Sequence, residues 1–139
     1  MKRVTDELLK ELKNAENIEA FFKANEDKFL NQTTSEYLNE LISIKNTSVA
    51  KVAADSGVGE YTYKVFGGSR KPSRDITIAI SFGMKLSLEE TQLLLRISKF
   101  AILDSRDKRD SIIIYALTHG LTIVQTDDLL DTKNLPTID

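Results

Sequence analysis

The chain has 139 residues, of which 41% are hydrophobic and 29% charged, and its formal net charge at pH 7 is −2. These values are ordinary for a globular protein and argue against a strongly basic nucleic-acid-binding protein. The absence of cysteine excludes disulfides and thiolate metal sites. The sequence has neither the long apolar run of a membrane span nor the apolar core of a signal peptide, so we expect a cytoplasmic protein.

Two amphipathic helices are predicted in the amino-terminal segment. The first is expected over 5–14, with Thr5 as its N-cap, and the second over 17–30, with Asn17 as its N-cap. The apolar residues that recur at helical spacing are Leu8, Leu9, Leu12, Ile18, Phe21, Phe22 and Phe29. We interpret 1–31 as an N-terminal helical extension.

Five further helices are predicted over 34–97. Thr33 with Glu36, and Ser87 with Glu90, have the spacing of capping boxes, in which two residues three apart bond to each other's backbone N–H. Ser48 begins a helix that ends near Gly57, where glycine supplies a left-handed C-cap. Two more helices are expected over 60–66 and from Ser73 to Gly83. Although 60–66 could be read as a strand, the chain offers no partner strand that would satisfy its backbone.

The carboxy-terminal third repeats the pattern that precedes it. RDITIAISFGMKLSLEETQLLL (74–95) aligns without a gap on RDSIIIYALTHGLTIVQTDDLL (109–130), at a constant offset of 35 residues. Either the segment is duplicated or two helix pairs share their capping chemistry, since Thr122 and Gln125 repeat the capping box. Both explanations predict a two-helix hairpin over 109–130.

The helices at 48–56 and 60–66, joined by a glycine-containing turn, have the pattern of a helix-turn-helix. The segments SVAKVAADSGV (48–58) and VFGGSRKPSRD (65–75) resemble the phage-repressor type of helix-turn-helix domain, the XRE group of bacterial and phage regulators. With LSLEETQ (86–92) and the added carboxy-terminal helices, the chain is similar to a subgroup of small bacterial regulators.

The resemblance implies an all-α fold with three parts. These are the N-terminal extension (1–31), a five-helix repressor-like helix-turn-helix core (32–98), and a C-terminal helical hairpin and tail (99–139). It also implies a DNA-binding transcriptional regulator that places 60–66, the recognition helix, in the major groove of double-stranded DNA. A homodimer is expected, because such motifs usually bind two half-sites.

Carried over residue by residue, the resemblance assigns three roles in DNA contact. Residues at the start of the recognition helix face the bases, the start of the supporting helix meets a phosphate, and the loop after the recognition helix runs beside the backbone. The residues assigned to these roles are Ser48, Glu60, Tyr61, Thr62, Lys64, Ser69, Arg70, Lys71 and Arg74. The charge distribution also favours DNA contact by this region, because 45–75 carries six Lys and Arg against three Asp and Glu.

Of the two tyrosines in the recognition helix, we expect Tyr61 to be exposed and Tyr63 to belong to the core. Asp75 and Asp110 each follow an arginine at a helix start, where a carboxylate complements the helix dipole, so we expect them to be structural. The only histidine, His119, has no evident catalytic partner. We therefore expect no enzyme, no metal and no cofactor.

The alternative is a protein–protein interaction module that has a repressor-like fold but has lost sequence-specific DNA binding. Val49, in place of the glutamine frequent in the family, the acidic Glu60 and the negative total charge favour it. Its partner would bind through the amino- or carboxy-terminal helices. That function predicts an exposed apolar patch on 1–31 or 109–130.

Overall fold

The computed structural model describes the backbone of residues 2–26 and 32–139, and the side chains of 6–26 and 32–139. Across those residues every regular element is a helix and no strand occurs, which confirms the all-α prediction. None of the described helices is long and apolar enough to cross a membrane. The chain divides into two compact units, residues 1–31 and 32–139.

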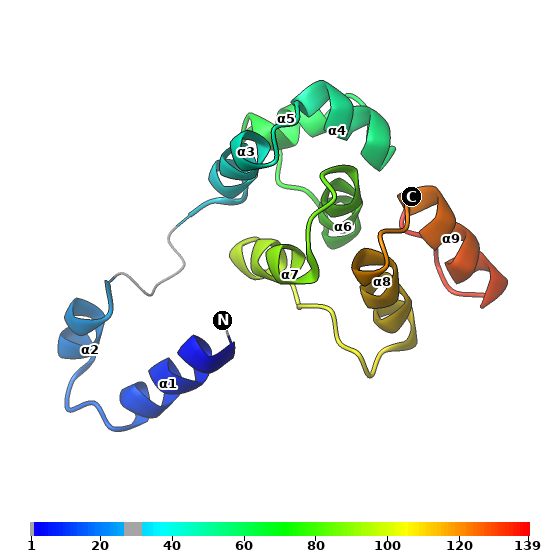
Figure 1. The fold of residues 1–139 in the computed structure, drawn as a ribbon. Helices are drawn as coiled ribbons and strands as arrows, with labels where there is room; N and C mark the ends of the chain where they lie inside the picture. Colours follow the sequence, from blue (N-terminus) through cyan, green and yellow to red (C-terminus); the bar gives the residue numbers. More distant parts are fainter. Residues whose placement is uncertain (1, 27–31) are drawn as a thin grey trace. The chain divides into compact units, whose positions relative to one another are not determined.

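The amino-terminal unit contains α1 (Lys2–Lys13) and α2 (Ile18–Ala24) (Figure 1). Because α1 begins at Lys2, the prediction that Thr5 caps it is wrong. Asn17 caps α2 as predicted, and its side chain accepts a hydrogen bond from the Ala20 amide at 2.8 Å. The predicted helix over 17–30 ends at Ala24, and residues 27–30 lie outside the described part.

The second unit contains seven helices within its residues 32–139, all of which the structure describes. They are α3 (Thr34–Ile44), α4 (Val49–Ser56), α5 (Tyr61–Phe66), α6 (Arg74–Gly83), α7 (Leu88–Ile97), α8 (Lys108–Thr118) and α9 (Ile123–Thr132). In Figure 1, α6 lies in the middle of this unit, with α4 on one side and α8 and α9 on the other. Five helices thus occupy 34–97, as the sequence predicts.

Two clusters of buried side chains form the core of this unit, and α6 and α7 contribute to both. Val52, Val65 and Leu94 belong to the cluster of α3 to α7. Ile78 and Leu95 pack instead with residues of α8 and α9. Residues 99–139 therefore share a core with α6 and α7 and do not form a unit of their own.

The predicted helix starts are set by local hydrogen bonds. Capping boxes are present at all three places where the spacing predicts one, beginning at Thr33, Ser87 and Thr122. Ser48 and Ser73 accept from the third residue of α4 and α6. Gly57 ends α4 with a left-handed φ of 76°, a conformation that costs glycine little. These starts and this end are confirmed.

The hairpins α6–α7 and α8–α9 make the same contacts at an offset of 35 residues. Arg74 donates to the carbonyls of residues 101 and 102, and Arg109 donates to those of 136 and 137. The two arginines then exchange partners: Arg74 pairs with Asp110 at 3.0 Å, and Arg109 pairs with Asp75 at 3.0 Å. Such reciprocal contacts are typical of two equivalent copies facing each other across a two-fold axis.

The similarity between the two hairpins continues beyond the segments that align in sequence. The Leu103 amide donates to the Gln92 side chain, and the Ile138 amide, 35 residues later, donates to Asp127. Residues with a left-handed φ also recur at this offset, at 85 and 120 and again at 99 and 134. Shared capping chemistry does not explain these distant contacts, so they favour duplication of a 35-residue hairpin.

Candidate nucleic-acid interface

The turn between α4 and α5 is held by two local hydrogen bonds. The Gly59 amide donates to the Ala53 carbonyl at 3.1 Å, and the Val58 amide donates to the Ser56 hydroxyl at 3.2 Å. Thr62 and Val65 of α5 are buried in the core and fix the side of the helix that faces inward. These contacts determine which residues of α5 face solvent.

The solvent-facing side of α5 presents Glu60, Tyr63 and Lys64. The assignment of Thr62 as a base-contacting residue is wrong, because its side chain is 0% exposed. Thr62 therefore cannot reach a groove unless α5 leaves the core. Its hydroxyl is buried without a hydrogen-bond partner among the described residues.

The expectation for the two tyrosines of α5 is reversed. Tyr63 is 50% exposed, whereas Tyr61 is half-buried and packs against the core. The Tyr61 hydroxyl donates to the Lys71 carbonyl at 3.3 Å. Tyr61 thus connects α5 to the loop that follows it, and Tyr63 is the aromatic side chain available to a partner.

The loop after α5 holds two adjacent cations on the surface. Ser69, Arg70 and Lys71 are all exposed. The Ser69 and Arg70 amides both donate to the Lys64 carbonyl, at 3.0 and 3.3 Å, which fixes the start of the loop against the end of α5. The Lys71 ammonium lies 5.9 Å from the centroid of the Phe100 ring, within the range of a cation–π contact.

A third cation, Lys99, lies beside these two. Arg70, Lys71 and Lys99 line one hollow of about 390 Å³, together with the start of α3 and the end of α7. None of the three forms an ion pair with any residue that the structure describes. Sequence reasoning missed Lys99, which is 28 positions after Lys71 and reaches the loop only through the packing of α7.

The two remaining residues that were expected to contact phosphate, Ser48 and Arg74, differ from each other in their surroundings. Ser48 is exposed at the start of α4, where its hydroxyl accepts a hydrogen bond from the Lys51 amide at 3.2 Å. Arg74, in contrast, is engaged inside the protein, because its guanidinium donates to Asp110 and to the carbonyls of residues 101 and 102. We therefore remove Arg74 from the expected phosphate contacts. Asp75 and Asp110, predicted to be structural, form ion pairs with Arg109 and Arg74 that the sequence did not predict.

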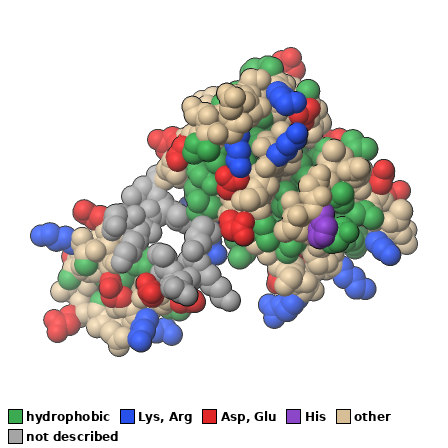
Figure 2. Space-filling view, viewed as in Figure 1, with side chains coloured by type: hydrophobic (Ala, Val, Ile, Leu, Met, Phe, Trp, Pro, Cys, Tyr) green, Lys and Arg blue, Asp and Glu red, His purple; other side chains and the backbone are tan. Residues whose placement is uncertain are grey.

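Charge of both signs is mixed over the surface. On the face shown in Figure 2, Lys and Arg side chains are interspersed with Asp and Glu and form no continuous basic area. Within the described ranges, no three His, Asp or Glu side chains come together as a metal ion would require. Comparison of the chain with known protein families, with curated proteins and with solved structures finds no match.

Proposed function

We propose that this protein binds double-stranded DNA as a transcriptional regulator, using α4 and α5 as a helix-turn-helix. The observation that carries the proposal is a group of three cations beside α5, Arg70, Lys71 and Lys99, which surround one hollow and form no ion pair with the residues that the structure describes. Cations that are free of protein carboxylates can neutralise phosphates and release the counterions condensed on DNA. Lys64, on the exposed side of α5, extends this group toward the groove.

In this proposal, phosphate contacts contribute more to the affinity for DNA than base contacts do. With Thr62 buried and Tyr61 half-buried, the recognition helix offers Glu60, Tyr63 and Lys64 to base edges. Glu60 can accept from a cytosine amine but repels phosphates. We therefore expect measurable affinity for duplexes of any sequence and a modest preference among sequences.

The double variant Arg70→Ala with Lys71→Ala tests this function. Fluorescence anisotropy with a random duplex, at several salt concentrations, gives the slope of log affinity against log salt. We expect the variant to bind more weakly and the slope to fall by about two, one for each lost phosphate contact. The matched control is Lys108→Ala with Lys133→Ala, which removes two exposed cations elsewhere and should leave the slope unchanged.

Two results would contradict the proposed function. One is the absence of binding by the unsubstituted protein at low salt. The other is an equal loss of slope in the two double variants, since this would mean that only the total charge matters and that the loop beside α5 has no special role.

The second candidate function is a protein-interaction module, which the exposed apolar side chains favour. Large apolar residues reach solvent in both segments where the alternative predicts them: Leu9, Leu12, Ile18 and Phe22 in the first unit, and Tyr115 and Val124 on 109–130. If the first unit forms a homodimer, Leu9→Ser with Phe22→Ser should lower the sedimentation coefficient to that of a monomer. An unsubstituted protein that already sediments as a monomer would count against that dimer.

A further inference from the structure

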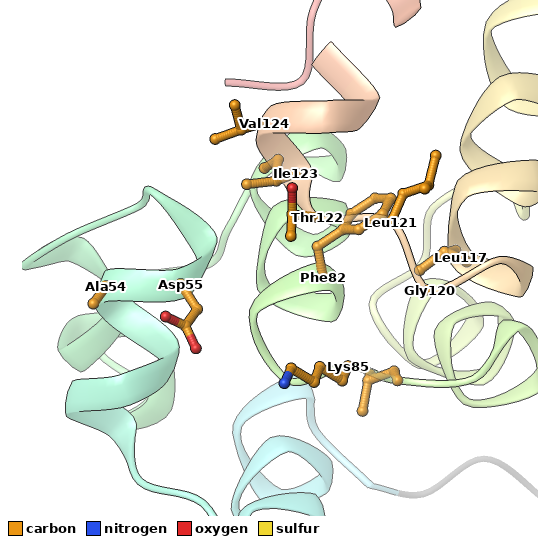
Figure 3. A pocket seen from close by; sticks show the side chains of 11 residues that line it. Ala54, Asp55, Phe82, Lys85, Leu117, Gly120, Leu121, Thr122, Ile123 and Val124 are labelled. Carbon is orange, nitrogen blue, oxygen red and sulfur yellow. The ribbon is translucent and has the colours of Figure 1, made fainter. Parts of the chain in front are cut away.

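A cavity of about 610 Å³ lies between α4 and the second hairpin, away from the cations beside α5. Figure 3 shows its walls: Ala54 and Asp55 of α4 on one side, Ile123 and Val124 at the start of α9 on the other, and Phe82 between them. Small-molecule sites in proteins are typically cavities of roughly 300–1,000 Å³. This one has the volume of a ligand site.

The lining of the cavity is mainly apolar. Leu86, Leu117 and Leu121 complete the walls together with Phe82 and Ile123. Val124, at the cavity, is 67% exposed. A bound apolar body would remove this surface from water, and the gain is about 25 cal/mol for each Å² buried.

Lys85 supplies the cavity with a positive charge. Its side chain is exposed and makes no ion pair with the described residues. The carboxylate at the cavity, Asp55, already pairs with Lys51 at 3.0 Å. The charge that is available to a ligand is therefore the Lys85 ammonium, which would attract an anionic group.

The walls are preformed by two equivalent turns. Lys85 and Gly120 are equivalent positions of the two hairpins, and both are left-handed, with φ of 55° and 69°. The amides of Leu86 and Leu121, which follow them, donate to the carbonyls of Ser81 and Ala116, both at 3.0 Å. A site that is already ordered loses less entropy when it binds a ligand.

We propose that this cavity binds a small amphipathic anion, an apolar body with one carboxylate or sulfonate that sits next to the Lys85 ammonium. The proposal is independent of the proposed DNA function, and its test contains no DNA. Binding would involve α4 directly, because Ala54 and Asp55 of that helix form one wall.

The test uses two fluorescent probes of similar shape and different charge. One is 1-anilinonaphthalene-8-sulfonate, which is anionic, and the other is N-phenyl-1-naphthylamine, which is neutral. In Lys85→Asn the charge is lost, and asparagine tolerates the left-handed backbone of this position. We expect the anionic probe to bind about tenfold more weakly to this variant, since one charge-assisted contact is lost. The neutral probe should bind it unchanged.

Two further variants locate the binding. Lys99→Asn is the matched control, because Lys99 is also exposed and left-handed, with φ of 67°, but does not line this cavity. It should leave both probes unaffected. Ala54→Trp, at an exposed position of α4 that lines the cavity, adds a bulky side chain there and should weaken the saturable binding of both probes, with unchanged helical circular dichroism.

The proposal is overturned if the unsubstituted protein shows no saturable binding of either probe. It is also overturned if Lys85→Asn weakens both probes equally, or if Ala54→Trp leaves binding intact. The last result would place the probes at another surface of the protein. Because DNA is absent throughout, failure here leaves the proposed DNA function unaffected.

Discussion

Replacing Asp110 by asparagine is expected to lower the free energy of unfolding by about 3 kcal/mol, because it removes the charge of a buried carboxylate that accepts hydrogen bonds from Arg74 and from the backbone. The Asp110 side chain is 10% exposed and accepts from both terminal nitrogens of Arg74. It also accepts from the Asp104 amide at 3.0 Å, which fixes the loop before α8. An asparagine amide can present only one acceptor oxygen to these three donors.

The duplication supplies a matched control for this substitution. Asp75 is the equivalent residue of the first hairpin and pairs with Arg109 in the same bidentate way, at 3.0 and 3.1 Å. Its side chain is 44% exposed, so water and salt screen the pair. We expect Asp75→Asn to cost less than about 1 kcal/mol.

Urea denaturation followed by circular dichroism gives both values. The expected order, with Asp110→Asn far more destabilising than Asp75→Asn, follows from the deeper burial of the Asp110 carboxylate and from its third donor, the Asp104 amide, because the two ion pairs have similar geometry. Equal losses would show that the reciprocal ion pairs do not differ in desolvation and would refute this reasoning.

The second large effect is expected at Gly83, where α6 crosses α4. A Cβ atom added there would lie 2.8 Å from the Ser56 Cβ and 3.0 Å from both the Ser56 nitrogen and the Val52 carbonyl oxygen. Two of these three neighbours are backbone atoms of α4, so rotation of a side chain cannot relieve the clash. We expect Gly83→Ala to lower the free energy of unfolding by about 2 kcal/mol, although alanine has the higher helix propensity.

Gly67 provides the comparison for Gly83. It also has a negative φ, of −77°, and an added Cβ would lie 3.2 Å from the Tyr63 carbonyl oxygen. We expect Gly67→Ala to change the free energy of unfolding by less than about 1 kcal/mol.

If the DNA proposal holds, Gly83→Ala should also weaken DNA binding, because it displaces α4, and Gly67→Ala should not. Equal stability of the two variants would contradict the close crossing of α4 and α6.

The sequence by itself determined where most helices begin and that the fold is all-α. A capping box needs only two side chains three positions apart, so Thr33, Ser87 and Thr122 could be read directly. The left-handed end of α4 at Gly57 was readable for the same reason, since the conformation depends on the residue itself. The repeat was also visible, because seven identical pairs lie at one offset.

Only the tertiary structure decided which side chains are free to act. Arg74 has the sequence context of a phosphate contact, but its guanidinium forms an ion pair with Asp110, which lies 36 positions later in the chain. The exposure of Tyr63 and the partial burial of Tyr61 depend on how α5 packs against the core, and six residues carry too short a periodic pattern to fix them. The residues that surround Lys85 and Lys99 come from helices distant in the sequence, and a local sequence pattern cannot predict such contacts.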